Sequence, residues 1–152
     1  MYKLTVISDI HRDIGRLERL IPKMNATDCA VCCGDGAREF LYARGRICVP
    51  TVCVRGNNDF DAVLTDAACI DFGGVNTFVA HGHKYGVKRG LDALSAVAVR
   101  DGCKLALFGH THVFFDGVVN GVRLINPGAL CCGSYAVVEI DGDNIDCKRF
   151  CV

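Results

Sequence analysis

The chain has 152 residues, with 17 basic and 17 acidic side chains and no net charge at pH 7. This length predicts a single domain over residues 1–152, and the balanced charge gives no sign of a nucleic-acid-binding surface. Although 51% of the residues are apolar, no run approaches the ~20 apolar residues of a membrane span, and no signal segment precedes the first apolar run. We therefore expect a cytoplasmic protein with no membrane partner.

The first half of the chain is predicted to alternate strands and helices. Apolar runs predict three strands, which begin at residue 4, span residues 29–33 and span residues 47–54. Helical spacing predicts a helix over residues 14–24, which Pro22 is expected to kink or end, and a second helix is expected over residues 37–44. This order predicts a βαβαβ unit with parallel strands and right-handed crossovers. Pro50 favours an edge position or a bulge for the third strand.

The second half is predicted to add hairpins and one further helix. Gly73-Gly74, Asn120-Gly121 and Asp141-Gly142 each separate two strand-like runs, as in tight hairpins. Strands are therefore expected at residues 69–72, 75–80, 114–119, 122–125, 135–140 and 145–150. A helix is predicted over residues 90–100 and a short strand over residues 105–108, and the strands that follow are expected to be antiparallel. The fold class is therefore α/β.

The chain contains 11 cysteines, most of them inside apolar runs. Cys29 and Cys32 form one Cys-x-x-Cys pair, but no second pair completes a four-thiolate zinc site. We therefore expect reduced thiols that act as small core residues, without a disulfide and without a part in metal binding.

Polar side chains follow the apolar runs in a repeated pattern. Asp9, Asp35 and Asn57 each come after a strand-like run, and so do all 5 histidines of the chain, which are His11, His81, His83, His110 and His112. Residues two apart at a strand end point to the same side, and the carboxyl ends of strands in an open α/β sheet are where ligands bind. Carboxylate, imidazole and amide groups suit Mn²⁺, Fe²⁺ or Zn²⁺. Their number fits two ions ~3.5–4 Å apart that share a bridging carboxylate.

The order of these motifs resembles that of the calcineurin-like metallophosphoesterases, and in particular the small YfcE-like phosphodiesterases. The motifs are Asp-x-His at 9–11, Gly-Asp at 34–35, Gly-Asn-x-Asp at 56–59, His-Gly-His at 81–83 and Gly-His-x-His at 109–112. Asn126-Pro127-Gly128 also matches a turn of that family. The resemblance implies a four-layer α/β/β/α sandwich, which suits a parallel first half and hairpins in the C-terminal part. It also implies two divalent metal ions, with Mn²⁺ expected first and Fe²⁺, Zn²⁺ or Ni²⁺ as alternatives.

The resemblance also implies a role for each matched residue. Three residues would hold the first ion, namely Asp9, His11 and His112. Three would hold the second, namely Asn57, His81 and His110, and Asp35 would bridge the two ions. His83 is then a candidate to face the substrate or to support a ligand. Arg12 and Arg55 follow two of the motifs and are candidates to contact substrate oxygens, with ordinary surface positions as the alternative.

Such a site suits the hydrolysis of a phosphate ester. Two divalent ions, two carboxylates and a hydroxide leave a net positive charge, which attracts an anionic phosphoryl group. We therefore predict a metal-dependent phosphoesterase, acting as a phosphodiesterase on a small phosphorylated substrate by in-line attack of a metal-bound hydroxide. A non-catalytic interaction scaffold of the same fold is the alternative, since the family resembles a retromer subunit with an impaired site. A redox protein built on the cysteines is a further alternative, and a homo-oligomer remains open.

One position departs from the family pattern. Many relatives carry a histidine where this chain has Asn58, and that histidine can protonate the departing oxygen. A neutral amide cannot act as a general acid. Asn58 is therefore either a turn residue or a sign that another group, such as His83, supplies the proton.

Overall fold

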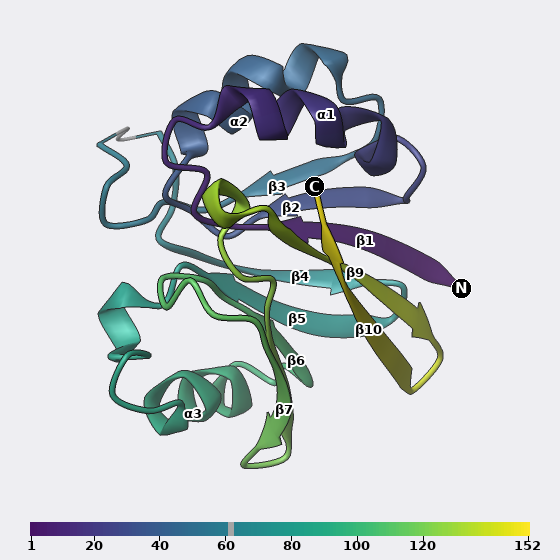
Figure 1. Ribbon diagram of the computed structural model, residues 1–152. Coiled ribbons are helices and arrows are strands. Elements are labelled where there is room, and N and C mark those ends of the chain that lie inside the picture. The colour runs from purple at the N-terminus through teal and green to yellow at the C-terminus, as the bar shows by residue number, and fades with distance from the viewer. Residues whose placement is uncertain (61–62) are drawn as a thin grey trace.

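Two sheets of five strands face each other, and helices cover the outer side of each sheet (Figure 1). The computed structural model describes residues 1–60 and 63–152. In spatial order, the first sheet consists of β10 (Asn144–Cys151), β9 (Ser134–Asp141), β1 (Tyr2–Ile7), β2 (Cys29–Cys32) and β3 (Thr51–Cys53). The second sheet consists of β4 (Ala67–Phe72), β5 (Val75–Ala80), β6 (Leu105–Leu107), β8 (Val122–Asn126) and β7 (Phe115–Val119).

The helices complete a four-layer arrangement. Helices α1 (Ile14–Met24) and α2 (Ala37–Ala43) lie over the first sheet, and α3 (Asp92–Arg100) lies over the second (Figure 1). Among the described residues, three short 3₁₀ helices span Arg44–Arg46, His83–Tyr85 and Leu130–Cys132. The predicted α/β class and α/β/β/α layering are therefore confirmed.

Strand β2 shows how the layers are held together. Cys29 and Val31 point into the apolar core between the two sheets, whereas Ala30 and Cys32 point into the core under α1 and α2. A strand that is buried on both faces has apolar residues at every position, which is why this segment is apolar throughout. A third core lies between α3 and the second sheet and includes Leu94.

All three parallel strands of the first sheet pair as the sequence predicts. Strand β1 pairs in parallel with β2, and β2 pairs in parallel with β3 at the edge of the sheet. The third strand is shorter than the predicted residues 47–54, because its regular pairing begins after Pro50. Proline has no N–H to donate to a ladder, although the Pro50 carbonyl still accepts a hydrogen bond of 3.0 Å from the Ala30 N–H. Pro22 does not end α1, which continues to Met24.

The C-terminal strands differ from the prediction in one pairing. The hairpins β7–β8 and β9–β10 are antiparallel as predicted, and β9 returns to the first sheet antiparallel to β1. Strand β8, however, lies parallel to β6. The chain leaves β6, crosses to the sheet edge as β7 and turns back through Asn120-Gly121, so β8 runs in the same direction as β6. The expectation that all strands after residue 108 are antiparallel is therefore wrong for this pair.

Burial divides the cysteines into three sets, and Cys53, Cys131 and Cys147 are intermediate. Cys29, Cys32, Cys33 and Cys103 are buried, as expected for core residues. Exposed positions are held by Cys48, Cys69, Cys132 and Cys151, so the prediction of a core role is wrong for them. All of the cysteines are free thiols in the structure.

No helix within residues 1–60 and 63–152 is both long and apolar enough to span a membrane.

Candidate metal centre

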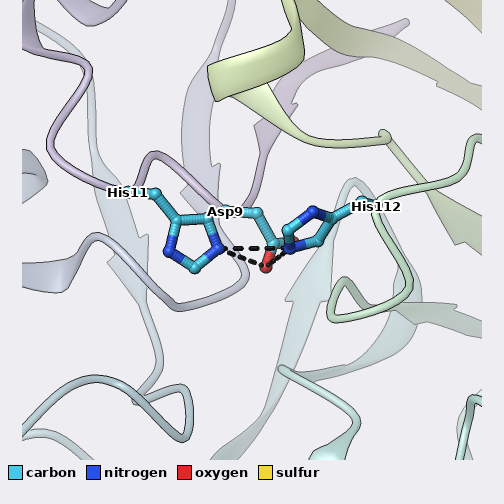
Figure 2. A group of neighbouring side chains, drawn as sticks. All are labelled: Asp9, His11 and His112. Atoms are coloured by element: carbon cyan, nitrogen blue, oxygen red, sulfur yellow. Dashed lines mark hydrogen bonds and ion pairs between the residues drawn. The ribbon is translucent and has the colours of Figure 1, made fainter.

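Asp9, His11 and His112 form the first group of potential metal ligands (Figure 2). Asp9 and His11 follow β1, and His112 follows β6, so the group joins residues from both sheets. The Asp9 Oδ1 atom lies 3.1 Å from Nε2 of His112 and 3.4 Å from Nε2 of His11, and the two Nε2 atoms are 3.1 Å apart. Asp9 is fully buried, and its Oδ1 has no hydrogen-bond partner among the described residues. A buried carboxylate oxygen facing two imidazole nitrogens fits the donor set of a divalent cation.

Asp35, His81 and His110 form the second group. Asp35 Oδ2 lies 3.3 Å from His81 Nε2, which is 3.2 Å from His110 Nδ1. The His81 Nδ1 atom lies 2.8 Å from the Cys33 carbonyl oxygen. Donation from Nδ1 to that carbonyl leaves Nε2 of a neutral His81 ring as the free donor toward a metal.

The ionisable groups of the second group shift each other's pKa values. Burial lowers the pKa of His81, but its hydrogen bond to Asp35 and the charge of Asp9 outweigh that effect, so the pKa lies above its ordinary value. Burial raises the pKa of Asp35, but hydrogen bonds from His81 and Asn58 bring it well below its usual range. The carboxylate at position 35 is therefore ionised at neutral pH, as a metal ligand must be.

The two groups are continuous with each other. Asp35 Oδ2 lies 3.8 Å from His11 Nε2 of the first group, and Asp9 Oδ1 lies 3.9 Å from His81 Nε2 of the second. Each carboxylate therefore faces histidines of both groups. This arrangement can hold two cations close together.

All of the candidate metal ligands in the two groups except His81 share an unusual backbone conformation. The φ angles of Asp9, His11, Asp35, His110 and His112 are +53°, +43°, +55°, +71° and +63°. A side chain other than glycine costs free energy in this left-handed region, of order 1–3 kcal/mol at each position. Such strain persists only where neighbouring structure enforces it. Here the Asp9 N–H donates to the Gly34 carbonyl at 2.9 Å, and the His11 N–H donates to the Asp35 carbonyl at 3.2 Å.

The turn after β3 holds Asp35 in place. The backbone N–H of Asn58 donates to Asp35 Oδ1, and its side-chain amide donates to Asp35 Oδ2, both at 2.8 Å. Asp59 accepts hydrogen bonds from the N–H groups of Asp35, Gly36, Ala37 and Gly56. This anchoring role of Asp59 was not predicted from the sequence, although the final aspartate of Gly-Asn-x-Asp was the available signal.

A second set of polar residues fixes the loop after β6. Buried Asn126 donates to the Gly109 carbonyl at 3.0 Å and to the Thr111 hydroxyl at 2.9 Å. The Asp9 Oδ2 atom accepts from the Ser8 hydroxyl at 2.7 Å and from the His110 N–H at 3.0 Å. A Cβ at Gly109 would lie 1.9 Å from the Ser8 hydroxyl oxygen, so only glycine fits there. These contacts leave Asp9 Oδ1 as the carboxylate oxygen that faces the histidines.

The structure places the remaining predicted residues around this cluster. Asn57 is exposed, and the contact with Asp35 is made by its neighbour Asn58. The His83 ring centroid lies 5.5 Å from that of His81, and its Nδ1 has no hydrogen-bond partner among the described residues. Burial and the charge of His81 lower the pKa of His83.

The two predicted arginines differ in position. Arg12 is exposed and lines a hollow of about 330 Å³ together with His11 and Asp35. Arg55 instead lies with its Nε 3.0 Å from Asp66 Oδ1. Hydrogen bonds from Arg55 and Lys84 lower the pKa of Asp66 to about 2. Arg12 is therefore at the candidate site, whereas the Arg55 guanidinium is engaged with a carboxylate.

Comparison with known proteins accounts for the pattern of motifs. A family model described as a calcineurin-like phosphoesterase superfamily domain matches residues 2–143. The chain belongs to the calcineurin-like phosphoesterase superfamily. "Probable metallophosphoesterase YsnB" of Bacillus subtilis is 30% identical over 145 residues, which cover 91% of this chain and 84% of that protein. "Phosphodiesterase MJ0936" of Methanocaldococcus jannaschii is 24% identical over 149 residues, which cover 86% and 85% of the two chains.

Solved structures of the superfamily show the same fold. A Streptococcus pneumoniae protein described as a predicted phosphoesterase gives a TM-score of 0.83 at 21% identity, over 99% of this chain and 89% of that one. Vps29 from Entamoeba histolytica, complexed with Zn²⁺, gives 0.75 at 21% identity over 98% of each chain. The resemblance stated from the motifs is therefore confirmed at the level of family and fold.

Proposed function

We propose that the chain is a phosphodiesterase that works with two divalent cations, Mn²⁺ in the first instance. Asp9, His11 and His112 would hold one cation, and Asp35, His81 and His110 would hold the other, with Asn57 as a further ligand. Such a pair supplies a nucleophile from water at neutral pH and stabilises charge on the phosphoryl oxygens. The observation that carries this proposal is the buried Asp9 Oδ1, which faces three imidazole Nε2 atoms at 3.1, 3.4 and 3.9 Å.

Residues around the two ligand groups orient a ligand carboxylate and supply positive charge for the substrate. Asn58 holds both oxygens of Asp35, so that carboxylate is fixed before a ligand arrives. Arg12 is exposed, lines the hollow beside His11 and would attract an anionic ester. His83 is the titratable group beside the cluster that neither ligand group uses, which makes it the candidate to contact the departing oxygen.

The test is hydrolysis of bis-p-nitrophenyl phosphate by protein reconstituted with Mn²⁺, Fe²⁺, Zn²⁺ or Ni²⁺. We expect turnover that depends on the added metal and is lost in Asp9→Asn, while the folded fraction measured by circular dichroism stays the same. A panel of further phosphate esters would then identify the substrate class. Protein that binds two cations per chain but hydrolyses no ester would instead support the interaction scaffold, and the enzymatic proposal would be wrong.

A further inference from the structure

A groove leads from the candidate metal centre along the exposed face of α2. The hollow beside His11 and Asp35 shares Arg12 and Glu39 with a neighbouring hollow of about 390 Å³. The far hollow is lined by Arg12, Ile14, Arg38, Glu39 and Tyr42. Both volumes lie within the range of small-molecule sites. The groove is built at the carboxyl ends of β1, β2 and β3, where ligands bind in open α/β sheets.

The far hollow is lined by two arginines and one carboxylate, whereas the near hollow is also lined by Asp35 and Asp59. Arg12 and Arg38 both line the far hollow, and within residues 1–60 and 63–152 neither of them forms an ion pair. Glu39 lines the same hollow and also lacks an ion pair among the described residues. The balance in the far hollow favours an anionic group of a ligand, and the Glu39 carboxylate offers an acceptor for hydroxyl or amino groups of that ligand.

Aromatic rings border the same groove. Tyr42 is 74% exposed and lies one helical turn after Arg38, so both side chains share one face of α2. Phe60, which lies on the loop after β3, is 92% exposed and lines the part of the groove nearest Asp35 and Asn58. Exposed rings beside cationic side chains are the elements that stack and hold nucleobases on single nucleotides.

We propose, on the basis of the proposed function, that the substrate is a phosphodiester with one nucleoside substituent, which lies in this groove. The base would stack on Tyr42. The side chains of Arg12 and Arg38 would face the phosphate, and the Glu39 carboxylate would accept a hydrogen bond from a sugar hydroxyl. Water adds its oxygen to phosphorus, the bond from phosphorus to the other ester oxygen breaks, and that oxygen leaves as an alcohol with a proton from the water. The products are a nucleoside monophosphate and an alcohol. The neutral net charge of the chain favours one nucleotide over a long nucleic acid.

The experiment compares two diesters with the same leaving group on the metal-loaded full chain. Thymidine 5′-(p-nitrophenyl) phosphate carries the nucleoside, and methyl p-nitrophenyl phosphate lacks it. We expect kcat/KM to be about tenfold or more higher for the thymidine ester, because base stacking on one aromatic ring contributes on this scale. Tyr42→Ala and Arg38→Ala should lower the ratio of the two kcat/KM values several-fold, whereas Tyr42→Phe should retain it. Arg19→Ala, an exposed arginine of α1 outside the groove, is the matched control and should leave the ratio unchanged.

The possible outcomes separate this inference from the proposed function. A wild-type ratio near one, or a ratio that Tyr42→Ala and Arg38→Ala leave unchanged, would overturn the nucleoside site while the phosphodiesterase proposal stands. Failure to hydrolyse either ester would overturn both. Comparing inhibition by thymidine monophosphate with inhibition by a single-stranded decanucleotide distinguishes a site for one nucleotide from a site for a nucleic-acid strand. Much tighter inhibition by the decanucleotide would contradict a site for one nucleoside.

Discussion

Asn58 binds both carboxylate oxygens of Asp35, with its backbone N–H on Oδ1 and its side-chain amide on Oδ2, each at 2.8 Å. At this position many family members have a histidine that can act as an acid. In this chain the residue instead orients a carboxylate that belongs to the candidate metal centre. Groups that hydrogen-bond to metal ligands tune the affinity of the site as well as its geometry.

The first prediction follows from this contact. Asn58→Ala removes the side-chain hydrogen bond to Asp35 and leaves the backbone bond in place. We expect the affinity for Mn²⁺ to fall about ten- to hundredfold, the range typical for loss of a group that supports a ligand. Isothermal titration of metal-free protein measures the change. Asn144→Ala, at the start of β10, is the control, and an unchanged affinity in Asn58→Ala would show that this contact does not support the metal centre.

The second prediction concerns the departing oxygen. General acid catalysis contributes about 10²–10⁴-fold, and most for basic leaving groups. Because Asn58 cannot donate a proton as an acid, kcat/KM should fall steeply as the leaving-group pKa rises. Aryl diesters should therefore be hydrolysed well and alkyl diesters slowly. Asn58→His should flatten the dependence, at the cost of the Asp35 contact.

A series of diesters with leaving groups of different pKa measures that slope in the wild type and in His83→Ala. A steep slope in both would show that His83 supplies no proton. A steeper slope in His83→Ala alone would identify His83 as the acid. Shallow slopes in both would show that a different residue donates the proton, and the interpretation of position 58 would be wrong.

The third prediction concerns metal stoichiometry. Reconstituted protein should contain two divalent ions per chain by elemental analysis. Asp35→Asn should reduce binding at both positions, because Asp35 Oδ2 faces His81 at 3.3 Å and His11 at 3.8 Å. Asp9→Asn should mainly weaken the first position, where its Oδ1 lies closest to His112 and His11. One ion per chain, or none, would contradict a binuclear centre.

The sequence predicted which candidate ligands come together better than it predicted what holds them in place. Asp9, His11, His81 and His110 follow strand ends, and the continuous apolar runs before them show in the sequence where such ends fall. The Gly-Asn-x-Asp motif marked Asp59, but the contacts that Asn58 and Asp59 make could not be predicted, because they depend on the turn after β3 folding back onto the residues after β2. The parallel pairing of β6 with β8 was missed for a related reason: adjacent hairpin strands predict their own pairing but not the strand they join next.

The fourth prediction concerns the start of α1. The Asp13 carboxylate accepts a hydrogen bond of 3.0 Å from the Arg16 N–H and forms an ion pair with the Arg16 side chain. Asp13→Ala should lower the free energy of unfolding by about 1 kcal/mol, as is typical for loss of an N-cap. Chemical denaturation measures the change, and Asp143→Ala, whose side chain is 95% exposed, is the control.

The effect of Asp13→Ala should depend on pH. The hydrogen bond from the Arg16 backbone and the contact with its side chain lower the pKa of Asp13 in the folded protein. The ionised carboxylate therefore stabilises the fold fully above the unfolded pKa of about 3.9, and this contribution is lost as the pH falls below that value. The difference between wild type and Asp13→Ala should shrink below about pH 4. A difference that grows in acid would contradict this role.

The fifth prediction concerns the cysteines. Denatured, non-reduced protein should titrate with all 11 thiols. In the native protein Cys48, Cys69, Cys132 and Cys151 should react first, because they are exposed. Cys33 should react slowly, because burial raises its thiol pKa well above the ordinary value. A deficit of two thiols would point to Cys69 and Cys103, whose sulfur atoms are 3.9 Å apart.

Each candidate ligand group takes members from both sheets, so bound cations would crosslink the sandwich. Asp9, His11 and Asp35 follow strands of the first sheet, whereas His81, His110 and His112 follow strands of the second. A cation bound only by the folded chain stabilises it in proportion to the logarithm of the free metal concentration. Chelation would therefore release the two sheets from each other first at the edge that carries these loops, while the apolar core between the sheets keeps the rest of the sandwich closed.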